Sequence, residues 1–358
     1  MKRQKDTILI FRVGSLGDTL VALPAFHLIR QQYPMSQIVL LTNTPTKGMV
    51  KVAPSHQILM GSGLVDDYIA YPHKPAGIRD LVKLARAIRE LQPSATFYLM
   101  DYLRNRKHRL RDAVFFAAAG IWRVRGLWPG RDGNVPLPVK DKPPEWRESE
   151  ASRLLRSIGF DPKVLGRDLF SLRIQSHERD SAASLLRDYG MLSKPFIALS
   201  VGAKVPAKDW GQDRWLEFLA LLGQARGGFH LLLFGSADER ERCQQLLEAW
   251  PNGGINLCGQ LSPRQSAAVL ERAAVFVGHD SGPMHLANSV GITCVSIFAA
   301  REKPGIWFPY GNEEHVFYNH IRAIRPCDVA ERVQALLMAK NPDVYSSLHE
   351  HSDSNELA

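Results

Sequence analysis

The sequence predicts an α/β protein made of two doubly wound domains, each with a mostly parallel sheet covered by helices. Three observations lead to this prediction. Short apolar runs of strand length alternate with segments of helical spacing along both halves of the chain, and a proline-rich stretch without periodicity, residues 130–148, separates the two series. A third observation is the length of 358 residues, which is too great for one ordinary core and suits two.

The expected strands are the short apolar runs bounded by turn residues. They span residues 7–13, 38–41, 67–71, 95–100, 196–201, 229–234, 255–257 and 275–278, with one more after Gly291. The expected helices show apolar positions at helical spacing. They span residues 20–29, 78–91, 113–119, 150–157, 178–189, 214–225, 263–272, 284–290 and 326–338, with one more beginning near Glu239. The tail after residue 340 is polar and is expected to be loose.

Composition limits the class of protein. The formal charge of +9 makes an acidic partner plausible, whether nucleic acid, an anionic membrane or a phosphorylated substrate. The four cysteines are widely spaced without a C-x-x-C pair, so neither a disulfide framework nor a cysteine metal site is expected, and a reducing cytoplasm fits. The apolar run near the amino terminus is too short for a signal peptide, and no run reaches the length of a membrane span, so any membrane contact should be peripheral.

The first candidate site is the loop Gly14-Ser15-Leu16-Gly17-Asp18, which directly follows the strand at 7–13. Open α/β sheets bind ligands at the carboxyl ends of their strands, so Asp18 is expected to project into a binding crevice and could serve as a general base. The alternative is an aspartate that only caps the next helix. The spacing of the glycines differs from that of a dinucleotide-binding loop, which argues against a nicotinamide enzyme.

The second candidate site is the loop at residues 279–283, which joins a strand to a short helix. Asp280 and Ser281 are residue types that cap helices, and Gly282 lets the backbone approach a ligand closely. Free N–H groups at this helix terminus would attract phosphate, and His285 in the first turn would face the same site. The alternative is that Asp280 only caps the helix and His285 packs in the core.

Both loops resemble the motifs of a known enzyme family. The string Asp-Ser-Gly-Pro-Met-His-Leu-Ala at 280–287 resembles the diphosphate-binding loop of glycosyltransferase family 9, the lipopolysaccharide heptosyltransferases. The string from Ile10 to Asp18, with Leu-Pro-Ala at 23–25, resembles the amino-terminal motif of the same family. The resemblance covers both halves, with specific motifs at residues 8–25, 202–211, 233–239 and 275–298.

This resemblance implies the GT-B architecture, in which two Rossmann-like domains face a central cleft. Residues 1–172 would form the acceptor-side domain, residues 173–340 the nucleotide-sugar-binding domain, and residues 341–358 the polar tail. It also implies that Asp18 and Lys208 are catalytic, with Lys208 at the phosphates of the donor. Asp238 or Glu239 would hold the nucleoside, a choice that the sequence leaves open. The remaining expected donor contacts are Gly14, Ser15, Gly17, Lys204, Asp280, Ser281, Gly282, Met284 and His285.

One stretch departs from the family. After Phe298 the family commonly continues with Gly-Pro-Thr-Asp, whereas residues 299–302 here are Ala-Ala-Arg-Glu, which leaves the exact donor open.

A basic run in the first half holds five Lys or Arg among the eight positions from 104 to 111. In two-domain transferases of this architecture the amino-terminal domain usually receives the acceptor, so the run is expected to bind an anionic acceptor, the membrane surface, or both. The alternative is a solvated charged face. No nucleic-acid-binding motif accompanies the run, and nucleic acid is not expected as a partner. The residues concerned are Arg104, Arg106, Lys107, Arg109 and Arg111.

The resemblance thus identifies a cytoplasmic, inverting glycosyltransferase that moves a sugar, most simply heptose from ADP-heptose, onto a lipopolysaccharide-core or related glycan acceptor at the inner membrane surface. No metal cofactor is expected, because a helix terminus and Lys208 would stabilise the leaving diphosphate. Two alternatives stay open. One is a GT-B nucleotide-sugar enzyme of different donor or chemistry, such as an epimerase, and the other is a non-catalytic basic protein that binds a surface.

Overall fold

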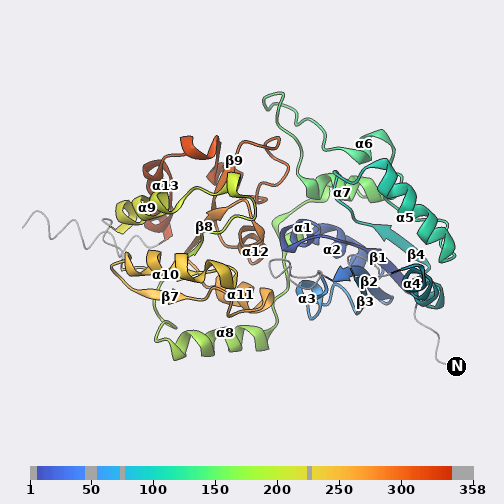
Figure 1. Ribbon diagram of the computed structural model, residues 1–358, viewed down its shortest axis with the longest axis horizontal. Helices are drawn as coiled ribbons and strands as arrows, with labels where there is room; N and C mark the ends of the chain where they lie inside the picture. Colours follow the sequence, from blue (N-terminus) through green and yellow to red (C-terminus); the bar gives the residue numbers. More distant parts are fainter. Residues whose placement is uncertain (1–5, 45–54, 73–76, 224–227, 341–358) are drawn as a thin grey trace, which may run out of the picture. The chain divides into compact units, whose positions relative to one another are not determined.

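A computed structural model describes residues 6–44, 55–72, 77–223 and 228–340 (Figure 1). The chain divides into two compact units. Unit 1 extends to Gln175 and includes Lys303–Trp307, whereas unit 2 comprises Ser176–Glu302 and the residues from Phe308 onward. The α/β class predicted from the sequence is confirmed. The predicted tail, residues 341–358, lies outside the described residues.

In its described residues, unit 1 contains a four-stranded parallel sheet with the order β3-β2-β1-β4. Its strands are β1 (Thr7–Phe11), β2 (Gln37–Thr44), β3 (Asp67–Pro72) and β4 (Ala95–Tyr98). Its helices are α1 (Leu16–Val21), α2 (Leu23–Gln32), α3 (Ser55–Leu59), α4 (Ile78–Leu91), α5 (Arg106–Ala118), α6 (Gly130–Asn134) and α7 (Glu150–Ile158), with 3₁₀ turns at Pro162–Val164 and Arg167–Phe170. Strands β2 and β3 lie on one side of β1, and β4 lies on the other side. The strand order therefore reverses between β1 and β4.

A hydrophobic cluster joins one face of this sheet to α4 and α5. Phe11 of β1, Ile88 of α4 and Phe116 of α5 are all buried in it, and the Phe11 and Phe116 rings meet edge to face with their centroids 5.5 Å apart. Beyond β4, the backbone of Arg125 pairs with the sheet, because its N–H donates to Thr96 (2.9 Å) and its carbonyl accepts from Tyr98 (2.8 Å). The sheet edge is therefore covered by the segment that follows α5.

Helix α5 differs from the prediction in where it begins. The expected helix was the apolar stretch 113–119, but the helix begins at Arg106 and contains most of the basic run. Asn105 caps it, with its side-chain oxygen accepting from the His108 N–H at 3.0 Å. The basic residues belong to this helix although they lack apolar periodicity. The Asn105 cap fixes where the helix begins, and the buried Phe116 anchors it to the core.

Unit 2 contains, in its described residues, a six-stranded parallel sheet with the order β10-β9-β8-β5-β6-β7. Its strands are β5 (Phe196–Ser200), β6 (His230–Leu233), β7 (Gly254–Asn256), β8 (Val275–His279), β9 (Cys294–Ala299) and β10 (Val316–Asn319). Its helices are α8 (Ser176–Asp188), α9 (Gln212–Gly223), α10 (Arg240–Glu248), α11 (Pro263–Leu270), α12 (Gly282–Ser289) and α13 (Pro326–Lys340), with 3₁₀ turns at Pro206–Lys208, Ala237–Glu239, Glu313–His315 and Ile321–Ala323. Here the strand order reverses between β5 and β8.

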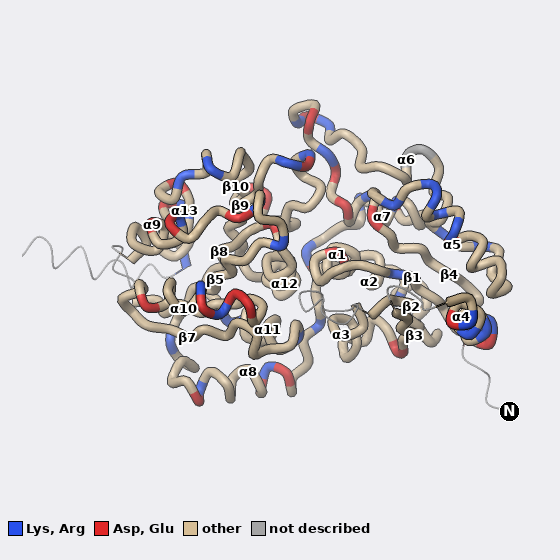
Figure 2. The backbone as a smooth tube through the Cα atoms, in the orientation of Figure 1, with Lys and Arg blue, Asp and Glu red and all other residues tan. Residues whose placement is uncertain are grey.

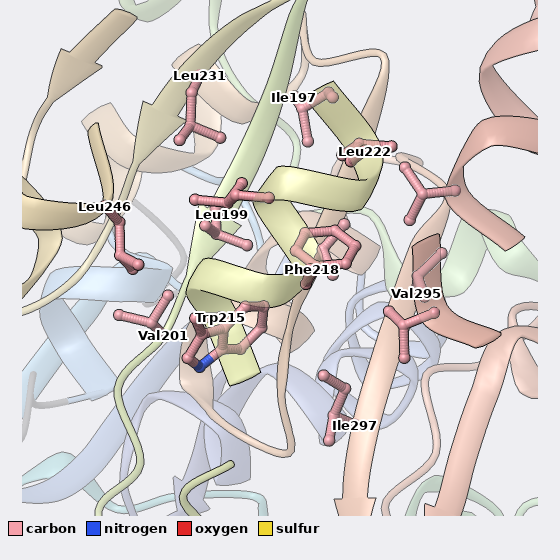
Figure 3. Close-up of a cluster of buried hydrophobic side chains, with 14 of the residues drawn as sticks. Ile197, Leu199, Val201, Trp215, Phe218, Leu222, Leu231, Leu246, Val295 and Ile297 are labelled. Carbon is pink, nitrogen blue, oxygen red and sulfur yellow. The ribbon is translucent and has the colours of Figure 1, made fainter. Parts of the chain in front are cut away.

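The core of unit 2 lies between the central strands and the helices that cover them. Leu199 of β5 and Ile297 of β9 pack in one cluster with Trp215 and Phe218 of α9 (Figure 3). Trp215 is fully buried, and its ring meets the Phe218 ring edge to face at 5.8 Å. This core holds the carboxyl ends of the central strands, and thus the loops that follow them, in fixed positions.

Several elements of the described residues were missed or misplaced by the sequence prediction. Helix α1 begins at Leu16, inside the expected loop 14–18, and α6 lies in the stretch 130–148 that was expected to be a loop. Strand β10 is only partly buried and has no long apolar run, and the single-turn helix α3 is too short to show a period. No helix among the described residues is long and apolar enough to cross a membrane.

Candidate functional site

The loops singled out in the sequence lie at the two points where the strand order reverses. At such a point the connections from adjacent strands leave toward opposite faces of the sheet, which opens a crevice at the carboxyl edge. In unit 1 the loop after β1 carries Asp18. In unit 2 the loop after β5 carries Lys208, and the loop after β8 carries Asp280.

The buried imidazole of His279 joins the β8 and β5 loops of unit 2. Its Nε2 accepts a hydrogen bond from the Trp210 backbone N–H (3.0 Å), and its Nδ1 lies 3.3 Å from the Gly202 carbonyl, so the neutral tautomer with hydrogen on Nδ1 satisfies both contacts. Burial lowers the pKa of His279 to about 4. His279 thus fixes both ends of the segment 202–210, which carries Lys204 and Lys208.

The Lys208 ammonium lies between two carboxylates. Its Nζ donates to Asp280 Oδ2 at 2.7 Å and to Glu302 Oε1 at 3.3 Å. Burial alone would lower the pKa of Lys208, but Asp280 and Glu302 raise it, so the ammonium stays charged. The next residue, Asp209, forms a bidentate pair with Arg242 of α10 at 2.6 and 2.9 Å, which holds the loop from its other side.

The amino terminus of α12 has no side-chain cap. Ser281 occupies the N-cap position, yet its side chain accepts no hydrogen bond from the helix, and its buried Oγ has no hydrogen-bond partner among the described residues. Pro283 follows in the first turn and has no N–H to satisfy. The backbone N–H groups of Gly282 and Met284 therefore form part of the positive amino-terminal end of the helix, where an anion would be stabilised.

Glu239 occupies a recess above two glycines. An added Cβ on Gly202 would lie 2.0 Å from Glu239 Oε1, and one on Gly235 would lie 2.3 Å from Oε2, so neither position has room for a side chain. Glu239 Oε2 also accepts from the Ser236 N–H at 2.9 Å. Its neighbour Asp238 is exposed and accepts from the Ser236 hydroxyl at 2.5 Å. The carboxylate that lies over the carboxyl ends of β5 and β6 is thus that of Glu239.

The other predicted donor contacts differ in accessibility. Lys204 is exposed, whereas the side chains of Met284 and His285 are buried. Met284 is fully buried, so only its backbone could reach a ligand. The α12 motif is therefore a half-buried loop followed by a buried first turn.

In unit 1, Asp18 lies in the first turn of α1 and closes the loop after β1. Its Oδ2 accepts from the Ser15 N–H (2.6 Å) and from the Ser15 hydroxyl (2.7 Å), whereas Oδ1 has no hydrogen-bond partner among the described residues. An added Cβ on Gly14 would lie 2.7 Å from the Asp18 Cβ, so the side chain needs a glycine there. Gly17 is buried inside the same turn. One carboxylate oxygen is held and the other is left for a ligand.

The side chain of Arg12 connects this loop to the end of a neighbouring strand. The side chain is fully buried; Nη1 donates to the Leu99 carbonyl at 2.6 Å, and Nη2 donates to the Asp18 carbonyl. Arg12 therefore joins the loop after β1 to the end of β4 across the point of strand reversal.

The basic run divides into inner and outer residues. Arg109 is buried and donates to the Gly126 and Leu127 carbonyls at 3.2 and 3.0 Å, so its guanidinium serves the fold of unit 1. Arg104 donates to the buried Asp112 at 2.6 Å. The outer residues Arg106, Lys107 and Arg111 are exposed, although Arg111 also contacts Asp112 at 3.0 Å.

Comparison with known proteins identifies similar sequences of one enzyme family. The model of glycosyltransferase family 9 (heptosyltransferase) matches residues 161–336. Lipopolysaccharide heptosyltransferase 3 of Escherichia coli is 22% identical over 313 residues, which are 84% of this chain and 86% of that protein. These matches confirm the resemblance to glycosyltransferase family 9 that the sequence motifs predicted, and the chain is accordingly a glycosyltransferase.

Two solved structures share the fold of this chain. The glycosyl transferase family 9 protein from Veillonella parvula DSM 2008 has a TM-score of 0.72 and 18% identity, and covers 95% of this chain and 99% of its own. The ADP-heptose lps heptosyltransferase II of E. coli has a TM-score of 0.68 and 21% identity, and covers 94% of this chain and 99% of its own. Both likenesses support the GT-B architecture expected from the sequence.

Three residues of this site were not given a role from the sequence. Glu302 lies within the stretch that departs from the family motif. The sequence places His279 at the start of the loop 279–283, although it is the last residue of β8, and predicts Arg12 only as part of the first strand. Their contacts are with residues far along the chain, which spacing does not show. Among the described residues, no group of three or more His, Cys, Asp or Glu could hold a metal ion.

The buried His279 predicts a pH dependence of stability. An unfolded histidine has a pKa near 6.5, so the unfolded chain binds a proton between about pH 6.5 and 4 that the folded chain does not. The stabilisation is complete above pH 6.5 and is lost as the pH falls toward 4. In urea unfolding, the free energy of unfolding of the wild type should fall by about 2 kcal/mol more than that of His279→Gln between pH 7.5 and 5.

The exposed His177 of α8 provides the control, because His177→Gln should keep the wild-type dependence. Equal pH dependence in wild type and His279→Gln would mean that His279 is not held neutral.

Proposed function

We propose that this chain is an inverting heptosyltransferase that transfers heptose from ADP-heptose to a lipopolysaccharide-core or related anionic glycan. The observation that carries the proposal is the arrangement in unit 2, where the charged Lys208 stands beside the loop that leads to the uncapped terminus of α12. Such an arrangement suits the diphosphate of a nucleotide sugar. The names of two similar proteins, lipopolysaccharide heptosyltransferase 3 and ADP-heptose lps heptosyltransferase II, support the choice of sugar and acceptor.

In this proposal Asp18 is the general base. Ser15 fixes its Oδ2, and Oδ1 takes the proton of the acceptor hydroxyl. The acceptor oxygen then attacks the anomeric carbon of the donor, while the bond from that carbon to the diphosphate oxygen breaks. ADP leaves with the bonding electron pair. A single displacement of this kind inverts the anomeric configuration.

The leaving diphosphate is stabilised by unit 2. Negative charge on the leaving oxygen grows in the transition state, so a cation and helix N–H groups at that point accelerate the reaction. Lys208, Ser281, Gly282 and the amide of Met284 supply these groups. Lys204, in the segment that carries Lys208, and His285, in the first turn of α12, are assigned to the same donor site. Asp280 and Glu302 hold the ammonium in place before the donor binds.

The nucleoside contact is assigned to Glu239 rather than Asp238. Glu239 lies over Gly202 and Gly235 at the carboxyl edge of β5 and β6, whereas Asp238 is exposed beside it. A carboxylate held in this way can accept hydrogen bonds from ribose hydroxyls or from an adenine amino group.

We assign acceptor binding to unit 1. We also place the reaction at the cytoplasmic face of the inner membrane. The exposed residues Arg106, Lys107 and Arg111 are suited to the phosphates and carboxylates of an anionic glycolipid. Arg104 and Arg109 support this surface from inside through their bonds to Asp112 and to backbone carbonyls.

The general base is tested by Asp18→Asn. The amide keeps the shape and an acceptor oxygen for Ser15 but does not take up the proton, so turnover should fall by about 10²–10⁴. Heptose transfer is measured by ADP release, with Asp67→Asn at the exposed start of β3 as control. Near-normal turnover in a folded Asp18→Asn protein would contradict the role. Conversion of the donor to an altered sugar nucleotide without acceptor would favour an epimerase.

The diphosphate site is tested by calorimetry with ADP. Lys208→Ala should weaken binding and slow transfer, and Gly282→Val should block binding because its side chain would obstruct the α12 terminus. Lys194→Ala is the matched control, because this exposed lysine precedes β5 at the opposite edge of the same sheet. Unchanged ADP binding in both site variants would place the pocket elsewhere.

The acceptor surface is tested by changing its exposed cations. Arg106→Glu and Lys107→Glu combined with Arg111→Ala should raise the acceptor KM roughly tenfold or more and flatten its salt dependence, while ADP affinity stays constant. Arg79→Glu with Lys83→Glu on α4 is the control for charge reversal at another exposed site of unit 1. An unchanged acceptor KM would leave these residues as a solvated face.

A further inference from the structure

The outer side of α5 is apolar as well as basic. Leu110 and Val114 lie one turn apart and are 60% and 63% exposed, and the exposed Lys107 and Arg111 lie on the same stretch of helix (Figure 2 marks the basic positions). A folded domain usually keeps such residues apart or covers them, and larger exposed apolar patches mark interaction sites. This face of the helix is therefore unusual for a surface that serves only solvation.

Two exposed tryptophans extend this apolar face. Trp122 is 81% exposed and Trp128 is 55% exposed, whereas Trp210, Trp215 and Trp250 are buried in the core of unit 2. With α5 they border a groove of about 680 Å³. Its apolar lining includes Val114, Phe116, Ala117, Trp122, Leu127 and Trp128.

The segment that carries the tryptophans is held firmly. Arg125, midway between them, pairs with β4 through its backbone, and its guanidinium lies 5.4 Å from the centre of the Phe97 ring. Arg109 of α5 donates to the Gly126 and Leu127 carbonyls. The two indoles are thus presented by a fixed scaffold, with no need for a rearrangement to expose them.

The charged residues that line the groove, Arg123 and Arg125, are both cationic. From Arg106 to Trp128 the sequence contains one acidic residue, Asp112, and that residue is buried and bonded to Arg104 and Arg111. The exposed charges of the stretch are therefore cationic, and Arg123 stands directly beside Trp122. A protein partner would commonly meet charges of both signs, whereas an anionic lipid surface meets cations with apolar side chains between them.

We propose that α5 and residues 121–128 form a membrane-docking surface. Trp122 and Trp128 enter the interfacial region of an anionic bilayer together with Val114, and Arg106, Lys107, Arg111 and Arg123 contact lipid phosphates. Indole rings favour this region because they have an apolar body and one polar N–H. The proposal deepens the proposed function, since a glycolipid acceptor lies in a bilayer, and names the surface that brings the enzyme to it.

The test is sedimentation of the purified full chain with vesicles of phosphatidylglycerol and phosphatidylethanolamine in equal parts, compared with vesicles of phosphatidylcholine. The wild type should bind the anionic vesicles, and its tryptophan emission should shift to the blue. Trp122→Ser combined with Trp128→Ser should weaken binding by about tenfold or more and abolish the shift. Tyr189→Ser, which removes a 49% exposed aromatic ring from unit 2, is the matched control.

Transfer to a soluble acceptor freed of its lipid separates docking from catalysis. The double tryptophan variant should retain wild-type transfer to this acceptor, and the single variant Trp122→Ser should show a partial loss of vesicle binding. Wild-type vesicle binding in the double variant, or no binding by the wild type, would overturn the proposal. Vesicle binding without heptose transfer by the wild type would instead leave docking in place and contradict the proposed function.

Discussion

Each unit is organised by the reversal of strand order beside its first strand. In unit 1, β4 lies on the far side of β1 from β2, and in unit 2, β8 lies on the far side of β5 from β6. Because all these strands are parallel, the loops that follow them leave from one edge of each sheet. The chemistry-bearing residues are placed where neighbouring connections diverge. Asp18 and Lys208 owe their positions to this constraint.

Loops that diverge in this way need contacts that fix their positions. In each unit a buried side chain, Arg12 or His279, makes hydrogen bonds to the backbone of these loops. Arg12 joins the Asp18 carbonyl to the Leu99 carbonyl, and His279 joins Gly202 to Trp210. Neither side chain is exposed. Both satisfy backbone groups that would otherwise lose their water partners without a replacement. Fixed loops allow Lys208 to stay charged between Asp280 and Glu302 before an anionic ligand arrives.

Much of this arrangement could be predicted from the sequence, because it depends on local signals. The strand at Val275, the helix around His285 and the glycine-rich turn before Asp18 are visible as apolar runs and turn residues. What could not be predicted depends on contacts between distant residues. The division of the basic run into inner and outer cations follows from the burial of Asp112, and the recess for Glu239 follows from the pairing of β5 with β6. The assignment of Lys303–Trp307 to unit 1 rests on bonds such as Glu150 N–H to the Ile306 carbonyl.

The central claim, transfer of heptose with inversion, is tested most directly by the product. The purified chain is incubated with ADP-heptose and a lipopolysaccharide-core acceptor that lacks the heptose, and the new linkage is determined by NMR. The account predicts release of ADP and a glycosidic bond whose anomeric configuration is opposite to that of the donor. A product with the configuration of the donor, or no heptose on the acceptor, would contradict a single displacement assisted by Asp18.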